Sequence, residues 1–333
     1  MKKKYTKKNP VDVYKKITDI VIKGLEEKGL NWFKTWTNEY GQEIEPRNHK
    51  TGYIYKGINP FICYMDAIHK GFDHNEWVGY KQAMDMGNPV KKEEAKNYTE
   101  LVIWYKMYYD KDQEKWLYWN QIKNLIASMD SQEVNERFLE RMFPKAQYVY
   151  NIAQLQGDVK PKFLPKLPTK KEEKFTPIQK AEKVYQDMPQ RPTLKHGGKK
   201  AYYSPSAHHV QMPMKENFNA SGKLVEADYY KTLFHELMHS SGHEDLLNRK
   251  TLVGVASFGD KTYSQEELVA EIGAMMMVSK LNLKPSDNLT NSKAYINGWV
   301  RHLKDHKKEV IFACSQAQKG VQFILGDGNQ ATS

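Results

Sequence analysis

The pentapeptide His235-Glu236-Leu237-Met238-His239 constrains this chain more than any other feature of its sequence. Residues four apart share one face of an α-helix, so a helix through the motif presents both imidazoles to the same point. His-Glu-x-x-His on a helix is the pattern by which metallopeptidases hold zinc with two histidines and keep the glutamate as general base. The motif therefore predicts a helix with a metal site, and it makes Glu236 the catalytic candidate.

A catalytic zinc takes three protein ligands and keeps its fourth position open, so one more ligand is required. Asp245 follows His235 by ten residues, where one class of metallopeptidases has its last histidine. Gly242 matches the glycine of that class, but Asp245 replaces the histidine. His243 stands two residues short of that spacing. Both residues remain alternatives for the third ligand.

A glutamate on a second predicted helix, over residues 264–283, is a further alternative. Glu267 and Glu271 are one turn apart on the same face, so one carboxylate could bind the metal while the other accepts a hydrogen bond from a ligand imidazole. Ser264 and Glu267 also match a capping box, which requires no metal. Spacing alone therefore leaves the third ligand open.

Charge is unevenly distributed along the 333 residues, whose net charge is +11. Residues 1–150 carry 25 Lys and Arg against 21 Asp and Glu, residues 151–200 carry 12 against 5, and residues 201–333 carry 14 of each. The part with the metal motif is neutral, and the positive excess lies in the first half and the segment after it. Such an excess favours a polyanion as partner, although a solvated charge run gives the same count.

Cysteine content and hydropathy bound the setting of the protein. Only Cys63 and Cys314 are present, both among apolar residues, which indicates buried reduced thiols and a cytoplasmic protein. No apolar run approaches the ~18–20 residues that span a bilayer, so no membrane partner is expected.

Length and pattern predict two domains of the α+β class. Residues 1–156 are predicted to form a mixed α/β domain, residues 157–176 an extended basic linker rich in proline and lysine, and residues 177–333 the domain with the motif helix. The expected helices are 11–29, 75–86, 128–142, 178–188, 226–241, 264–283 and material within 294–323, and the expected strands are 53–57, 101–109, 147–150, 201–205 and 209–213.

Aromatic residues alternate with basic and amide residues in the first predicted domain. Single-strand binding requires flat rings for base stacking and cations along the phosphate path, and these segments could supply both. An aromatic content of 12% must also be buried, which is the competing explanation for the rings. The candidates for nucleic-acid contact are Trp32, Trp36, Arg47, Asn48, Lys50, Tyr53, Tyr55, Lys56, Asn59, Trp77, Tyr80 and Lys91.

Residues 234–249 (FHELMHSSGHEDLLNR) and 263–276 (YSQEELVAEIGAMM) resemble the metallopeptidase domain of antirestriction proteins of the ArdC type. Residues 11–156 resemble the single-stranded-DNA-binding domain that precedes it in that family. One departure is the stretch 92–96 (KEEAK), where the family tends to have a glycine turn and more basic residues, which weakens the case for a phosphate contact there.

The resemblance implies Zn2+ held by His235, His239 and a glutamate of the second helix. We place that glutamate at Glu267, rather than at Glu266 or Glu271, and expect Glu271 to orient a ligand imidazole. Glu236 would then take a proton from water and pass it to the leaving amine.

The resemblance also implies a role: an antirestriction protein of a mobile genetic element, which binds single-stranded DNA and carries a zincin-like metallopeptidase domain. The expected partners are single-stranded DNA and an unidentified protein or peptide substrate, for which strand 201–205 is a β-augmentation candidate. Two rivals are a non-catalytic DNA-binding protection protein with a structural zinc site, and a processing protease that DNA binding directs to its substrate.

Overall fold

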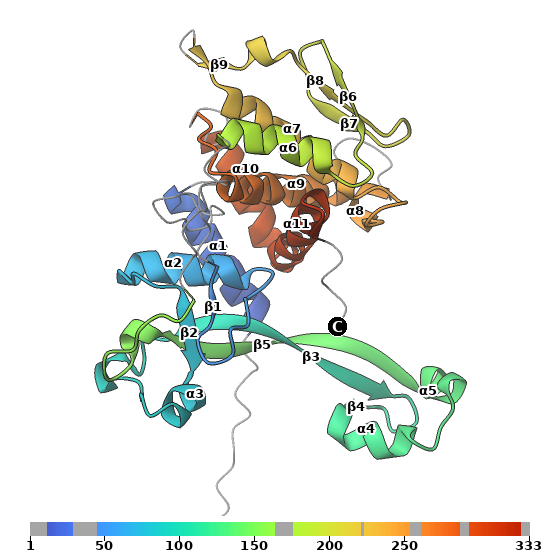
Figure 1. Ribbon diagram of the computed structural model, residues 1–333. Helices are drawn as coiled ribbons and strands as arrows, with labels where there is room; N and C mark the ends of the chain where they lie inside the picture. Colours follow the sequence, from blue (N-terminus) through green and yellow to red (C-terminus); the bar gives the residue numbers. More distant parts are fainter. Residues whose placement is uncertain are drawn as a thin grey trace, which may run out of the picture.

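The computed structural model describes residues 12–28, 45–163, 176–220, 223–253, 261–286 and 293–327. Figure 1 shows an α/β unit built on one long sheet and a mainly helical unit that carries a small sheet. The expected α+β class with two domains is confirmed. Trp32 and Trp36 lie outside the described residues, as does most of the predicted linker.

The first unit contains a five-stranded sheet of order β1-β2-β5-β3-β4. Helices cover it at one end and at the tip of its longest strands (Figure 1). Its elements are α1 (Val13–Lys28), β1 (Arg47–Asn48), α2 (Asn59–Lys70), β2 (Glu76–Gly79), α3 (Tyr80–Asp85), a 3-10 turn (Lys92–Glu94), β3 (Thr99–Asp110), β4 (Lys115–Tyr118), α4 (Trp119–Ile126), α5 (Ser131–Arg137), β5 (Phe138–Asn151) and a 3-10 turn (Ile152–Gln154).

Strands β3 and β5 pair antiparallel over twelve residues, from Thr99 opposite Val149 to Asp110 opposite Phe138. They form an arm that extends from the body of the unit (Figure 1). At its tip, β4, α4 and α5 enclose a small apolar cluster of Leu117, Ile122 and Phe138. The tip therefore has a core of its own, separate from the main one.

Two expected helices are shorter than their sequence pattern indicated. The helix predicted over 128–142 ends at Arg137, because the following residues pair with β3 as strand β5. The helix predicted over 75–86 begins only at Tyr80, because residues 76–79 form β2 between β1 and β5. In both places pairing with strands distant in the sequence overrides local helical pattern.

Helix α1 packs on helices α10 (Lys293–Asp305) and α11 (Glu309–Ile324), which belong to the second unit. Its apolar side chains Ile17 and Val21 are fully buried, in the same cluster as Leu303 and Val310. The Thr18 hydroxyl also donates to the carbonyl of Lys307 at 2.5 Å. The two units therefore share one continuous apolar core.

The boundary expected at residue 156 lies later in the structure. The backbone amides of Lys162 and Phe163 donate to the buried carboxylate of Glu76 at 3.0 and 2.8 Å. The Arg47 guanidinium lies over the Phe163 ring, 5.2 Å from its centroid. Residues 157–163 are thus fixed to the first unit instead of forming linker, because Glu76 supplies acceptors for their backbone.

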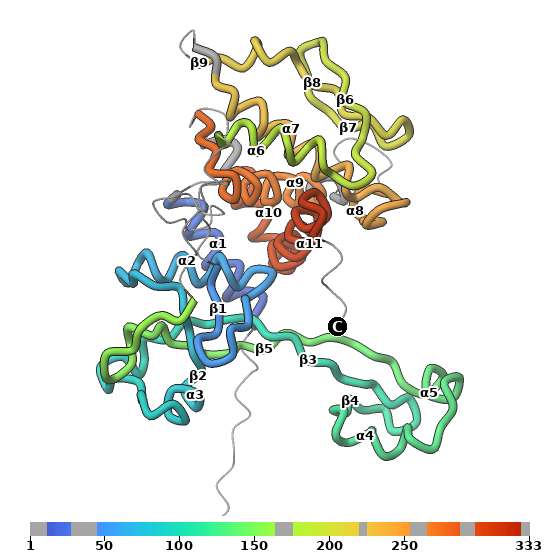
Figure 2. The backbone as a smooth tube through the Cα atoms, in the orientation of Figure 1, coloured from blue at the N-terminus to red at the C-terminus, as the bar shows by residue number. Residues whose placement is uncertain are grey.

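The second unit packs helices α7, α9 and α11 together and places a three-stranded sheet, of order β6-β8-β7, against α7. Figure 2 follows its chain from the small sheet into α7. Besides α10 and α11, its elements are α6 (Pro177–Asp187), β6 (Thr193–His196), β7 (Tyr202–Ser204), β8 (His209–Met212), a 3-10 turn (Lys215–Asn217), β9 (Asn219–Ala220), β10 (Lys223–Leu224), α7 (Glu226–Ser241), α8 (Lys250–Val253) and α9 (Lys261–Lys280).

Two glycines allow α9 and α11 to approach α7 closely around Met238. A Cβ at Gly273 would lie 2.4 Å from the Met238 methyl, and a Cβ at Gly320 would lie 2.3 Å from it. Met238 is fully buried and stands next to His239 in the motif. This close approach brings the acidic residues of α9 within reach of the motif histidines.

Candidate metal centre

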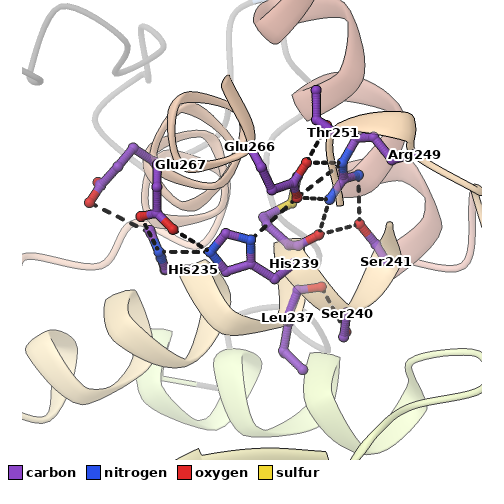
Figure 3. Close-up of polar contacts among 11 residues, drawn as sticks. His235, Leu237, His239, Ser240, Ser241, Arg249, Thr251, Glu266 and Glu267 are labelled. Atoms are coloured by element: carbon purple, nitrogen blue, oxygen red, sulfur yellow. Dashed lines mark hydrogen bonds and ion pairs between the residues drawn. The ribbon is translucent and has the colours of Figure 1, made fainter. Parts of the chain in front are cut away.

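Helix α7 places the two motif histidines side by side, with their Nε2 atoms 3.1 Å apart. Glu267 reaches them from α9, with Oε2 3.5 Å from Nε2 of His235 and Oε1 3.3 Å from Nε2 of His239. Figure 3 shows the three side chains converging from the two helices. The structure thus brings together the three residues that we predicted as ligands.

These separations fit one divalent metal ion. Zinc bonds of ~2.0–2.1 Å in tetrahedral arrangement put neighbouring ligand atoms about 3.4 Å apart. The ligand atoms offered by His235, His239 and Glu267 all lie within 4.8 Å of one another. Two imidazoles and one carboxylate are also a donor set of catalytic zinc sites. Geometry and chemistry therefore agree on a metal site at this point.

Glu266 holds His239 from the opposite side of the ring. Its Oε1 lies 3.3 Å from Nδ1 of His239, and this contact leaves Nε2 facing Glu267. Arg249 donates to the same carboxylate, from Nη2 at 2.6 Å and from Nε at 2.8 Å, and the Thr251 hydroxyl donates at 2.5 Å (Figure 3). Sequence reasoning considered Glu266 only as an alternative ligand and missed Arg249, because no spacing rule connects them.

Glu271 stands behind the other histidine. Its Oε1 lies 3.6 Å from Nδ1 of His235, one helical turn beyond Glu267 on the same face of α9. Each imidazole thus has one nitrogen toward the shared point and the other toward a carboxylate. Since α9 begins at Lys261, Ser264 lies inside the helix, and the capping-box explanation of Glu267 does not apply.

The centre carries an excess of negative charge that a cation would neutralise. Although burial opposes it, the carboxylates of Glu266 and Glu267 raise the pKa of His239 to about 10. Burial alone would raise the pKa of Glu266. Contact with His239 and Arg249 outweighs this effect and lowers the pKa of Glu266 to about 2. Without a metal, protons on the imidazoles supply the missing positive charge. A divalent ion would replace those protons.

Glu236 is 7% exposed and lies beside both histidines. Burial raises the pKa of its carboxyl, with the nearby histidines acting in the opposite direction. A raised pKa suits a group that must take a proton and release it near neutral pH. Its position therefore fits the role of general base.

The two alternative ligands near the motif lie apart from this centre. His243 faces Asp245, with Nδ1 3.5 Å from the carboxylate, and it accepts the backbone N–H of Asp245 at 3.2 Å. The Asp245 side chain is 81% exposed. Within the described residues, the grouping of metal-ligating side chains contains His235, His239 and Glu267 and neither of these two.

Comparisons with known proteins cover both halves of the chain. The family model for the N-terminal domain of anti-restriction factor ArdC matches residues 11–150, and that for zincin-like metallopeptidases matches residues 179–316. The crystal structure of metal-free antirestriction ArdC protein from the R388 plasmid aligns with 97% of this chain and 100% of its own, at 25% identity and a TM-score of 0.63. The chain is an ArdC-type protein.

Further matches share the ArdC-type fold or sequence. The Mn(II)-bound structure of the R388 protein has the same fold, at 24% identity and a TM-score of 0.62. Uncharacterized protein y4eC of Sinorhizobium fredii is 28% identical over 94% of this chain and 92% of its own length. A DNA primase TraC of Escherichia coli is 29% identical over 93% of this chain, which spans only 19% of that primase.

The predicted nucleic-acid residues of the ArdC-type chain have different surroundings. Trp77 is fully buried against Phe72, so the prediction that it contacts nucleic acid is wrong. A groove of about 950 Å³ is lined by five of the candidates: Asn48, Tyr53, Tyr55, Lys56 and Asn59. Tyr80, 55% exposed, is outside that lining. The aromatic pattern in the sequence did not distinguish core rings from surface rings.

Several of these polar candidates already bind other parts of the protein. Asn48 accepts from the amides of residues 50 and 51 and donates to Gln82 at 2.8 Å, which shapes the turn after β1. Asn59 exchanges two hydrogen bonds with the backbone of Val102. Among the bases, Arg47 pairs with Glu45, Lys50 with Asp85, and Lys91 donates to the carbonyl of Ala153. The polar groups of these residues are therefore engaged within the protein, and a nucleic acid would have to compete with these partners.

None of the described helices is both long and apolar enough to cross a membrane.

Proposed function

We propose that this ArdC-type protein binds single-stranded DNA and carries a zinc-dependent peptidase site, and that it acts in antirestriction for a mobile genetic element. The observation that carries the peptidase part is the convergence of His235, His239 and Glu267 on one point, with a carboxylate behind each imidazole. Such outer carboxylates are characteristic of metal-ligating histidines. The plasmid origin of the R388 ArdC protein supports the mobile-element role.

The chain's own residues divide the work of peptide hydrolysis. A divalent ion at this site would lower the pKa of water and polarise the substrate carbonyl. Glu236, buried with a raised pKa, would take the proton from water and deliver it to the leaving amine. Glu266 and Glu271 keep the histidine rings oriented by facing their Nδ1 atoms. The general base is thus separate from the ligand carboxylate of Glu267 and from the two orienting carboxylates.

Zinc is our choice of metal because the donors are two imidazole nitrogens and one carboxylate at near-tetrahedral spacing. The R388 protein has been crystallised with Mn(II), which makes manganese the competing ion. Metal analysis of protein purified without added metal, and again after exposure to equimolar zinc and manganese, distinguishes the two. Preferential retention of manganese would contradict the zinc assignment.

Strand β7 is suited to hold an extended peptide. Among the described strands only β8 pairs with it, which makes it an edge of the small sheet, and it packs against α7. Tyr203 of this strand lies near Glu236, whose carboxyl interacts with the Tyr203 backbone. A peptide added to the free edge by β-augmentation would therefore pass close to the general base.

The test is a pair of isosteric variants. Glu236→Gln should retain the metal and lose hydrolysis of an unfolded protein such as casein, because Gln cannot accept the proton. Glu244→Gln, an exposed glutamate just beyond the motif helix, should leave both unchanged. Comparing both variants in a plasmid-transfer assay against a restricting host then tells whether hydrolysis serves antirestriction. Full hydrolysis by Glu236→Gln would overturn the peptidase assignment.

A further inference from the structure

The groove of about 950 Å³ lies between the two units. One wall is the segment from Asn48 to Asn59 with the base of β3, and the opposite wall is α11 of the peptidase unit. Figure 2 shows α11 (dark red) above the root of the arm. The first unit alone would therefore provide only part of this groove.

Among the described residues, the charged side chains that line the groove are all of one sign. Lys56 lines one wall, and Lys308 and Lys319 line the other. All three lysines are exposed, and the part of the lining that the structure describes contains no aspartate or glutamate. The lining therefore favours an anionic occupant.

Exposed rings stand among these lysines on three separate segments: the loop between β1 and α2, strand β3 and helix α11. Tyr53 is 57% exposed, Trp104 on β3 is 43% exposed, and Phe312 on α11 is 40% exposed. Large apolar rings that remain exposed in a concave site provide stacking faces for unpaired bases. Rings and lysines together match a single strand better than a duplex, in which the bases are already stacked.

The two walls are fixed relative to one another. The backbone amide of Gly57 donates to Oε1 of Gln318 on α11 at 2.7 Å, at the groove itself. Gly57 has φ +67, a conformation that favours glycine. Helix α11 is in turn packed on α9, which carries Glu267. The groove is thus pre-formed and connected to the metal centre by one helix contact.

We infer that this groove takes a short stretch of single-stranded DNA, and that α11 of the peptidase unit and its N-cap residue Lys308 supply part of the DNA site through Lys308, Phe312 and Lys319. The inference rests on the proposed DNA binding and extends it to a helix outside the ArdC N-terminal domain. Bound DNA would then touch both units at once.

The experiment measures binding of the full chain to a fluorescent oligothymidine by anisotropy at several salt concentrations. Lys308→Ala combined with Lys319→Ala should weaken binding about tenfold at ~100 mM salt and reduce the slope of log affinity against log salt by about 1.4, since each phosphate contact on a single strand contributes ~0.7. The matched control is Lys199→Ala with Lys200→Ala, which removes the same charge from an exposed loop of the same unit.

A second variant keeps the charge and removes a ring. Phe312→Leu should weaken binding about tenfold, from the loss of one stacked base, and leave the salt slope unchanged. Thermal unfolding of each variant checks that the fold is kept. If wild type binds the oligonucleotide and both α11 variants bind like the control, the inference is overturned while the proposed DNA binding stands. If wild type does not bind, the DNA-binding part of the proposed function and this inference both fail.

Discussion

The same isosteric change should weaken metal binding more at Glu267 than at the adjacent Glu266, and should destabilise the metal-free fold more at Glu266 than at Glu267. Glu267→Gln removes a ligand carboxylate, so metal binding should fall below detection. Glu266→Gln removes only the acceptor behind His239, and loss of such an outer partner typically lowers metal affinity 10- to 100-fold. The metal should therefore remain measurable in Glu266→Gln by titration with a competing chelator.

In the metal-free protein, Glu266→Gln should lower the free energy of unfolding more than Glu267→Gln does. The side chains of Arg249 and Glu266 are 1% and 2% exposed, so little solvent screens their pairing. Breaking one partner of a buried ion pair costs about 3–5 kcal/mol, because the remaining charge is left uncompensated. The Glu267 side chain is 24% exposed and pairs with the two histidine rings, with no arginine partner among the described contacts, so its more solvent-screened charge should cost less to neutralise than that of Glu266.

The measurement is urea unfolding in EDTA, run beside the chelator titration. If Glu266→Gln eliminates metal and Glu267→Gln keeps it, the assignment of ligand and supporting residue is reversed and the reasoning fails. Equal stability loss in both variants would refute the argument from the buried Arg249 pair. The two assays therefore check the ligand role and the structural role separately.

Three other perturbations test the fold around the centre. Removing the metal with EDTA should lower the free energy of unfolding by about 2.7 kcal/mol relative to protein at 100 times its Kd for metal, and an unchanged melting temperature would argue against a native-state site. Gly273→Ala should destabilise by about 1–3 kcal/mol through its collision with Met238, whereas Gly298→Ala on α10, with open space around it, is the control that shows the gain of about 0.5–1 kcal/mol from helix propensity alone. Because the pKa of Glu266 is lowered to about 2, its contribution to stability is complete above pH 4.5 and is lost as pH falls toward 2, so acid unfolding of metal-free protein should be shallower in Glu266→Gln.

The two histidine ligands could be predicted from the sequence because they follow helical periodicity, whereas the choice of Glu267 as third ligand rested on the resemblance to ArdC-type proteins. Four-residue spacing places His235 beside His239, and the same rule pairs Glu267 with Glu271. What remained hidden is what holds these residues in place. Arg249 follows the motif helix in a short loop, and only the folded chain shows that its guanidinium meets Glu266. A contact between a loop and a second helix produces no regular residue spacing in the sequence from which it could be predicted.

The fold of the first unit was harder to predict from the sequence, because it too depends on contacts between distant segments. Residues 128–142 have a helical pattern, yet the stretch from Phe138 pairs with β3 across 28 to 50 sequence positions. Trp77 and Trp104 stand in similar local sequence, rich in aromatics, but one is buried and the other is 43% exposed. Which ring faces solvent depends on strand order in the sheet, and that order is set by pairing between distant segments.

The burial of α1 beneath α10 and α11 affects how the chain can be made. During synthesis the apolar face of α1, including Ile17 and Val21, leaves the ribosome long before its cover exists. The hydrogen bond from Thr18 to Lys307 joins residues 289 positions apart, so at ~5–20 residues per second this face waits roughly 15–60 s. A nascent first unit would therefore expose the apolar face of α1, which is prone to aggregation, for that interval. It reaches its finished form, including the groove wall on α11, only once the peptidase unit has been made.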